Sequence, residues 1–149
     1  RIIAEAIQQM WKKNLNINVA LQNQEWKVYL DRQREMDYQV SRAGWTGDYP
    51  DPNTFLDMWT SWSQQNQTGW STPEYDALIR KAAITKDPAE RLEVFQQAEE
   101  ILMDELPIIP IYIYTRIYAL HPAVKNWHAN VLDHHPWKHV DLDLSKLKE

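Results

Sequence analysis

The sequence predicts an α/β or α+β protein that forms a single lobe. Segments with apolar residues at three- and four-residue spacing, which is typical of helices, alternate with segments of period two, which is typical of strands. No internal repeat accompanies this alternation. The chain has 149 residues, 44% of them apolar, which is about the length of one domain with enough apolar side chains for a core.

Two helices are expected in the first quarter of the chain. Apolar residues recur at helical spacing over residues 1–13. Nothing ahead of Ile2 can cap this helix, so we expect its start to lie upstream and the chain to be a fragment of a longer protein. A shorter helix is expected over residues 25–34, with Trp26, Tyr29 and Leu30 on one side.

Two further helices are predicted by residues that are typical of helix starts. Ser71-Thr72-Pro73-Glu74 combines a hydroxyl cap, an early proline and a glutamate that can reach back to the cap. The signal recurs at residues 87–90, and the second of these helices is expected to run to about Glu105, before Pro107 stops it. The side chains expected to be buried are Tyr75, Leu78, Ile79 and Ala82 in the first helix, and Leu92, Phe95, Ala98, Ile101 and Leu102 in the second.

Strands are expected over residues 15–21, 37–42, 108–114 and 116–120. Residues 43–52 contain two glycines and two prolines, which predicts a loop of fixed geometry, and a helical turn or two is expected over residues 53–59. Residues 61–69 are polar and indicate an exposed loop, whereas the last thirty residues show no convincing period.

Composition excludes several classes of function. The formal net charge of −5 provides no general attraction for nucleic acid or anionic lipid. The absence of cysteine excludes disulfides, thiolate metal sites and cysteine nucleophiles. The three glycines, Gly44, Gly47 and Gly69, cannot build a glycine-rich phosphate loop, so nucleotide enzymes of that type are excluded.

The most informative candidate site combines Arg42, Trp45 and Asp48. Arg42 leaves an expected strand, Asp48 follows two glycines, and Trp45 lies between them. This set suits a zwitterion, because Asp48 can pair with an ammonium, Arg42 with a carboxylate, and the indole of Trp45 can form an apolar wall. The alternative is an ordinary ion pair at a strand end beside a packed tryptophan.

Other patterns leave alternatives open. The tryptophans near the polar loop, Trp59, Trp62 and Trp70, could stack on sugar rings or peptide side chains, whereas Trp11 is expected in the core. The histidines of the tail offer a metal site or an ordinary surface, and a carboxylate pair would suit a glycoside hydrolase. The histidines are His121, His128, His134, His135 and His139. The carboxylates are Asp48, Asp51, Asp104 and Glu105.

Four separated motifs resemble the oligopeptide-binding proteins of bacterial ABC importers, solute-binding protein family 5. They are residues 24–30 (Gln-Glu-Trp-Lys-Val-Tyr-Leu), 42–52 (Arg-Ala-Gly-Trp-Thr-Gly-Asp-Tyr-Pro-Asp-Pro), 71–76 (Ser-Thr-Pro-Glu-Tyr-Asp) and 106–114 (Leu-Pro-Ile-Ile-Pro-Ile-Tyr-Ile-Tyr). The resemblance covers about residues 1–120, and the tail more loosely. It implies an α/β fold, the C-terminal part of one lobe of a type II periplasmic-binding-protein-like fold, with a mixed sheet and flanking helices.

The resemblance also implies roles for seven residues. An extended peptide would be enclosed between two hinged lobes, with its backbone bonded like an added strand. The aspartate of the second motif would pair with the peptide's ammonium, its arginine would meet a peptide carboxylate, and the residues between them would offer a wall and backbone groups. An earlier tryptophan would line a side-chain pocket, and a tyrosine would lie at the cleft. In the order of these roles, the residues are Asp48, Arg42, then Trp45, Thr46 and Gly47 between them, Trp26 and Tyr114.

The implied protein is a receptor and not an enzyme, and it needs neither a cofactor nor a metal. Residues 1–115 would belong to the C-terminal lobe, and residues 116–149 would be a return segment that packs on the other lobe. The expected partners are the oligopeptide, the membrane permease subunits of the importer and an N-terminal lobe upstream. The expected location is periplasmic or extracellular, with or without a lipid anchor. The open alternatives are a carbohydrate-binding or carbohydrate-active module, and a dipeptide or nickel-chelate receptor on the same scaffold.

Overall fold

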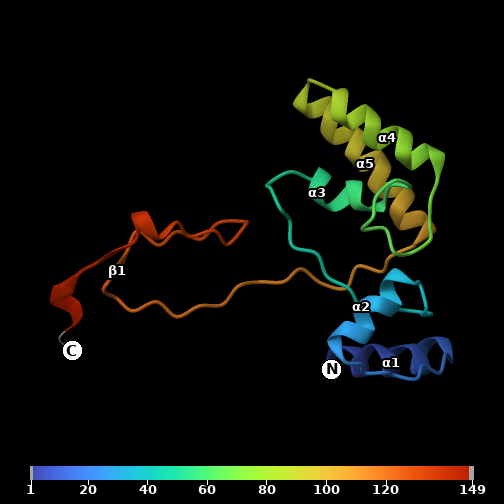
Figure 1. Ribbon diagram of the computed structural model, residues 1–149, viewed down its shortest axis with the longest axis horizontal. Helices are drawn as coiled ribbons and strands as arrows, with labels where there is room; N and C mark the ends of the chain where they lie inside the picture. The colour runs from blue at the N-terminus through green and yellow to red at the C-terminus, as the bar shows by residue number, and fades with distance from the viewer. Residues whose placement is uncertain (1, 148–149) are drawn as a thin grey trace. The chain divides into compact units, whose positions relative to one another are not determined.

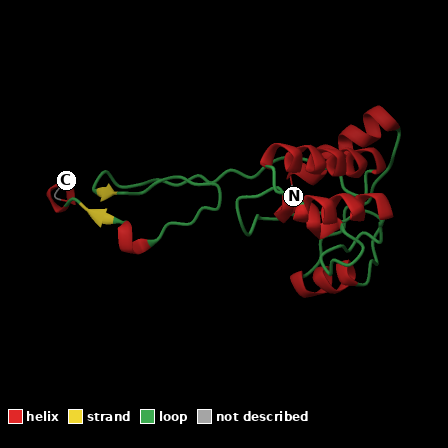
Figure 2. Ribbon diagram, turned by 90° about the horizontal axis from the view of Figure 1, so that it is seen from above, coloured by secondary structure: helices red, strands yellow, loops and turns green. Residues whose placement is uncertain are grey.

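The structure is a computed structural model that describes residues 2–147. The chain divides into two compact units, one ending at Ser41 and the other beginning at Arg42. Figures 1 and 2 show that helices provide most of the regular structure in both units.

The first unit contains the two helices expected there, α1 (Ile2–Leu15) and α2 (Trp26–Arg34). The carboxylate of Glu25 caps α2 by accepting hydrogen bonds from the backbone N–H groups of its first turn. Each helix is followed by a residue with positive φ, Asn16 at 57° and Met36 at 55°. The chain reverses there because the left-handed conformation lets the next N–H reach back to the last carbonyls of the helix. The backbone N–H of Asp37 makes such a bond, 2.9 Å long, in α2.

The second unit is built around α3 (Asn53–Leu56), the 3₁₀ turn η1 (Asp57–Trp59), α4 (Pro73–Ile84) and α5 (Pro88–Glu105). The helices α4 and α5 pack side by side, and α3 lies against α5 (Figure 1). Their facing sides form one apolar core. The buried residues are Leu56, Tyr75, Ile79, Ala82, Val94, Phe95, Ala98 and Leu102.

The ends of α5 follow the sequence signals closely. Asp87 caps its start, since its carboxylate accepts hydrogen bonds of 2.9 Å from the N–H groups of Ala89 and Glu90. Leu106, with φ of 49°, ends the helix as expected just before Pro107. One expected buried side chain is wrong, because Leu92 is 55% exposed and Val94 occupies the core instead.

The start of α4 differs from the expected capping box. Thr72 occupies the cap position and Pro73 the first turn, as expected. The hydroxyl of Thr72 makes no capping hydrogen bond to the described residues of the helix. Pro73 has no N–H, so the first turn of α4 has one fewer backbone donor that needs a partner.

Tyr75 is the largest side chain of this core with no exposed surface, and its hydroxyl donates a 2.6 Å hydrogen bond to the carbonyl of Leu56. Burial raises the pKa of Tyr75. We expect Tyr75→Phe to lower the free energy of unfolding by about 1–3 kcal/mol, because the buried carbonyl loses its donor. Urea denaturation measures this effect. The exposed Tyr118 provides the matched control, Tyr118→Phe, and an equal loss in both variants would contradict the assignment.

The expected strands are wrong as local assignments. The two-stranded antiparallel sheet pairs β1 (Val124–Lys125) with β2 (Asp141–Leu142), and both lie in the tail, as do the 3₁₀ turns η2 (Trp137–His139) and η3 (Leu144–Leu147) (Figure 2). Residues 16–21, 37–42 and 108–120 carry no strand. A strand needs a hydrogen-bonded neighbour, and none of the described residues pairs with these segments.

The side chains of residues 108–120 illustrate the same point. Ile113 is 92% exposed and Ile117 is 96% exposed. The period-two pattern therefore identifies a segment that is suited to a sheet, although the described residues do not supply one. No helix within residues 2–147 is both long enough and apolar enough to span a membrane.

Candidate functional site

The predicted loop of fixed geometry leads directly into α3. Backbone hydrogen bonds close a tight turn, from the N–H of Asp51 to the carbonyl of Tyr49 at 2.9 Å and from the N–H of Thr54 to the carbonyl of Asp51 at 3.2 Å. The backbone N–H of Asp48 donates to the Thr54 hydroxyl at 3.0 Å, and Thr54 is only 2% exposed. The backbone at Asp48 is thus held by a buried residue, which confirms the expected fixed geometry.

Gly47 packs closely against α3 within this loop. A Cβ atom at this position would lie 3.1 Å from side-chain atoms of both Thr54 and Phe55, whereas a Cβ at Gly44 would have nothing within 4 Å. A side chain at this position would need Thr54 or Phe55 to shift slightly, so glycine suits the close approach of the loop to α3. Gly47 therefore helps to place its neighbour Asp48.

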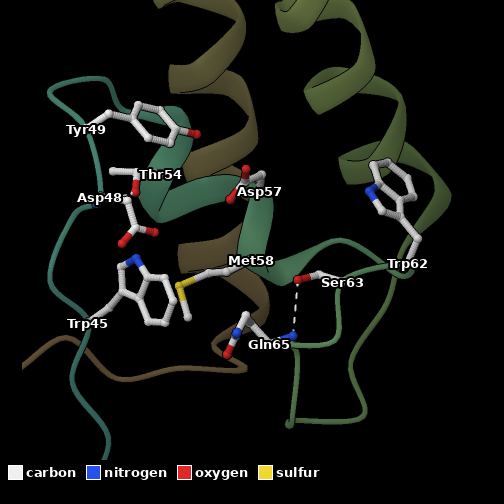
Figure 3. A pocket seen from close by; sticks show the side chains of 9 residues that line it. All are labelled: Trp45, Asp48, Tyr49, Thr54, Asp57, Met58, Trp62, Ser63 and Gln65. Atoms are coloured by element: carbon white, nitrogen blue, oxygen red, sulfur yellow. Dashed lines mark hydrogen bonds between the residues drawn. The ribbon is translucent and has the colours of Figure 1, made fainter.

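A pocket of about 300 Å³ opens beside the loop (Figure 3). Asp48 and Trp45, two of the predicted site residues, line it, and Figure 3 shows the Asp48 carboxylate next to the indole of Trp45. Asp48 is solvent-accessible, and its carboxylate has no hydrogen-bond or ion-pair partner within residues 2–147. The full lining is Trp45, Asp48, Tyr49, Thr54, Asp57, Met58, Trp62, Ser63 and Gln65.

Asp57 brings a second carboxylate to the same pocket. Burial raises its pKa, and the nearby charge of Asp48 adds to the increase. Its carboxylate accepts a 2.9 Å hydrogen bond from the amide of Asn53. The described lining residues include no lysine or arginine, so the pocket favours a cationic group over an anionic one.

Arg42 and Tyr114, two more of the predicted site residues, are brought together although 72 positions separate them. The Arg42 guanidinium donates a hydrogen bond to the Tyr114 hydroxyl, and its carbon lies 5.9 Å from the ring centre. The ring of Tyr112 lies 4.6 Å from that of Tyr114. A hydrogen bond from Tyr112 and the charge of Arg42 lower the pKa of Tyr114. Both tyrosines are exposed, and with Arg42 they form a cationic, aromatic surface.

Trp26 begins α2 in the first unit, where the residue is 65% exposed and its ring stacks on that of Tyr29 with ring centres 5.2 Å apart. An exposed, stacked indole is suited to contact a ligand. Its predicted place in a side-chain pocket stays a prediction. Thr46, also predicted at the site, is exposed and lies between Trp45 and Gly47.

The structure separates packed from exposed side chains among the tryptophans and carboxylates considered for other functions. Trp59 and Trp70 pack against the core, whereas Trp62 is 50% exposed and lies under the guanidinium of Arg80 at 4.2 Å. Glu105 accepts a 2.6 Å hydrogen bond from the indole of Trp70. Its carboxylate is therefore engaged with an aromatic side chain, which gives no support to the carboxylate pair of a hydrolase.

Histidines of the tail make local contacts. His135 stacks on Trp127 with ring centres 3.7 Å apart and bonds to Asp133 at 2.9 Å. Within residues 2–147, no three His, Asp or Glu side chains gather in a way that would hold a metal ion.

The predicted polar loop is closed by one side chain, Asn66. Its amide nitrogen donates to the carbonyls of Trp59, Thr60 and Trp70 at 3.0, 3.3 and 2.8 Å. Its oxygen accepts from the hydroxyl of Thr68 at 2.8 Å. Both ends of the loop are thereby fixed, and the part between them supplies two of the pocket residues, Ser63 and Gln65.

Sequence reasoning missed two residues that hold the site loop. Thr54 carries no motif, and Arg91 lies 40 positions from its partner Asp51, to which its guanidinium donates two hydrogen bonds of 2.6 and 2.9 Å. Asp51 lies in the turn, where its carboxylate accepts a 2.9 Å hydrogen bond from the N–H of Asn53. The only sequence signal for this contact was the carboxylate of Asp51 between two prolines, and that pattern does not indicate which cation pairs with Asp51.

Comparisons with known proteins show which sequences and folds this chain resembles. Residues 1–67 match the family model described as bacterial extracellular solute-binding proteins, family 5 middle. The chain is 45% identical over 114 residues to the oligopeptide-binding protein OppA of Bacillus subtilis, covering 76% of this chain and 21% of the relative. It is 39% identical over 140 residues to the dipeptide-binding protein DppE of the same organism, covering 94% of this chain and 25% of the relative. The chain thus spans about a quarter of the length of these curated relatives.

A solved structure matches over most of the chain. It is OppA of Haemophilus influenzae in complex with the peptide RPPGFSPFR, with a TM-score of 0.83 and 35% identity over 94% of this chain and 28% of that one. The fold is therefore part of one lobe of a type II periplasmic binding protein. The chain belongs to family 5 of the bacterial extracellular solute-binding proteins. This is a family of substrate-binding proteins of transporters, and membership supports a periplasmic or extracellular location.

Proposed function

We propose that this chain is part of a receptor, a longer protein that captures oligopeptides between two lobes for import by an ABC transporter. The observation that carries the proposal is the unpartnered carboxylate of Asp48 beside Trp45 in a pocket with no lysine or arginine among its described lining residues. Every unmodified peptide carries an ammonium at its N-terminus, and a carboxylate held in place can bind it in any sequence. Two relatives are named as an oligopeptide-binding and a dipeptide-binding protein, which supports this ligand class.

The other predicted residues receive roles that fit their positions. Trp45 forms an apolar wall of the ammonium pocket, and the backbone of Thr46 and Gly47 offers hydrogen bonds to the peptide backbone. Arg42, oriented by Tyr114, meets a peptide carboxylate. In this proposal, Trp26 lines a pocket for a peptide side chain.

The receptor needs partners beyond this chain. In this proposal residues 1–115 belong to the C-terminal lobe, residues 116–149 return to the other lobe, and the closed receptor delivers peptide to the permease subunits of the importer. Closure is driven by the higher affinity of the closed form for the peptide. The receptor acts outside the cytoplasmic membrane, free or lipid-anchored, and it performs no catalysis.

Titration calorimetry of the receptor with trialanine tests this function. We expect saturable binding of trialanine and at least tenfold weaker binding of N-acetyl-trialanine, because acetylation removes the ammonium that Asp48 would meet. Maltotriose and nickel chloride are titrated as comparison ligands. Binding of either one without binding of trialanine would contradict the proposal and favour the carbohydrate or nickel alternative.

A further inference from the structure

The loop that carries Asp48 is tied to α5 through Asp51 and Arg91. Asp51 lies in the tight turn between Asp48 and α3, three residues after Asp48. Its two carboxylate oxygens each accept one hydrogen bond from the Arg91 guanidinium, at 2.6 and 2.9 Å. Such a two-point contact fixes orientation as well as distance, which a single-point ion pair does not.

The guanidinium of Arg91 is itself held in place on three sides. Its Nε atom donates to the carbonyl of Ala82 at 3.2 Å, at the end of α4, and its carbon lies 4.5 Å from the ring centre of the buried Phe95. The side chains of Arg91 and Asp51 are 29% and 30% exposed. The pair is therefore partly shielded from solvent, and a hydrogen bond from Arg91 lowers the pKa of Asp51. Asp51 remains charged at neutral pH.

The route from this ion pair to Asp48 is short and continuous. The carbonyl of Asp51 accepts from the N–H of Thr54 at 3.2 Å, and the hydroxyl of Thr54 accepts from the N–H of Asp48 at 3.0 Å. The core between α4 and α5 is closed by buried apolar side chains and does not include the loop. The ion pair is thus an attachment of the loop to α5 in addition to the core packing of Leu56 in α3.

We infer that Asp51 and Arg91 are positioning residues, which set the place of the Asp48 carboxylate and through it the affinity for the peptide ammonium. This inference rests on the proposed function. Loss of the ion pair lets the loop move relative to α5, and the distance between carboxylate and ammonium then varies. Affinity for an ammonium falls even though neither Asp51 nor Arg91 contacts the ligand.

The test is a double-mutant cycle on trialanine binding in the receptor, read by calorimetry. Asp51→Asn and Arg91→Gln are each expected to weaken binding about three- to tenfold, and the double variant no more than either one alone. Asp51→Asn is the milder change, because an asparagine oxygen can still accept the bond from the N–H of Asn53. Lys81→Gln on α4 is the matched control, because it removes one positive charge, as Arg91→Gln does, at an exposed position. It is expected to leave the affinity for trialanine unchanged.

A readout in the Asp48→Asn background separates positioning from a general structural role. There, Arg91→Gln is expected to weaken binding by less than about twofold, since the group it positions is already uncharged. An equal loss in both backgrounds, or unchanged affinity with Asp48 intact, would overturn the inference. If Asp48→Asn itself leaves affinity unchanged, the assignment of Asp48 to the ammonium fails instead, whereas the proposed function fails only if the unchanged receptor does not bind trialanine.

Discussion

Replacing Asp48 by asparagine is expected to weaken trialanine binding by the receptor about ten- to a hundredfold. The carboxylate would lose its charge-assisted hydrogen bond to the peptide ammonium, a contact of about 1.5–3 kcal/mol. Folding is expected to be unaffected, because Asp48 contacts the fold through its backbone N–H, which donates to Thr54 and is retained in the variant. Calorimetry measures the affinity, and a thermal melt measures the stability.

The control for this variant is Asp104→Asn. Asp104 is an exposed carboxylate in the last turn of α5, so the substitution changes the net charge equally without touching the pocket. We expect its affinity for trialanine to match that of the unchanged receptor. An equal loss in the two variants would show a general electrostatic effect, and no loss in Asp48→Asn would remove Asp48 from the site.

Replacing Phe95 by alanine is expected to lower the free energy of unfolding by about 3–5 kcal/mol. Phe95 is 3% exposed at the interface of α4 and α5, and truncation would leave a cavity that the neighbouring side chains fill only in part. The ring also supports the guanidinium of Arg91, 4.5 Å away. Its loss is therefore expected to loosen the attachment of the site loop as well.

Leu92, 55% exposed on the same helix, provides the comparison. Leu92→Ala is expected to change the free energy of unfolding by less than about 0.5 kcal/mol, because it removes little buried surface. Urea denaturation, followed by far-ultraviolet circular dichroism, measures both variants. Similar losses for Phe95→Ala and Leu92→Ala would contradict the core described for the second unit.

Helices were predicted well because their signals are local. The cap at Asp87 and the stop before Pro107 act within a few residues, and both lie where the sequence indicated. Strand positions failed because a strand depends on a partner that can lie anywhere in a protein. The exposed Ile113 and Ile117 have the side chains of a strand without a neighbour among the described residues. Leu92 was predicted to be buried in place of Val94 because both are apolar and lie near the buried face of the helix. Helical spacing alone does not decide which of the two enters the core.

The candidate site was predictable as far as the loop itself. The glycines, Trp45 and Asp48 were recognisable because the loop is continuous in sequence, and the structure places Trp45 and Asp48 at one pocket. Contacts made by residues from other elements were not predictable. The bond between Arg42 and Tyr114 joins positions 72 residues apart, and no spacing rule reports on such a contact.

Asn66 has a consequence for how ligand preference can diverge among proteins built on this scaffold. This single amide fastens both ends of its loop. Ser63 and Gln65 lie there and face the pocket (Figure 3). Substitutions at Ser63 and Gln65 would therefore reshape one side of the pocket, while the helices and Asp48 stay unchanged.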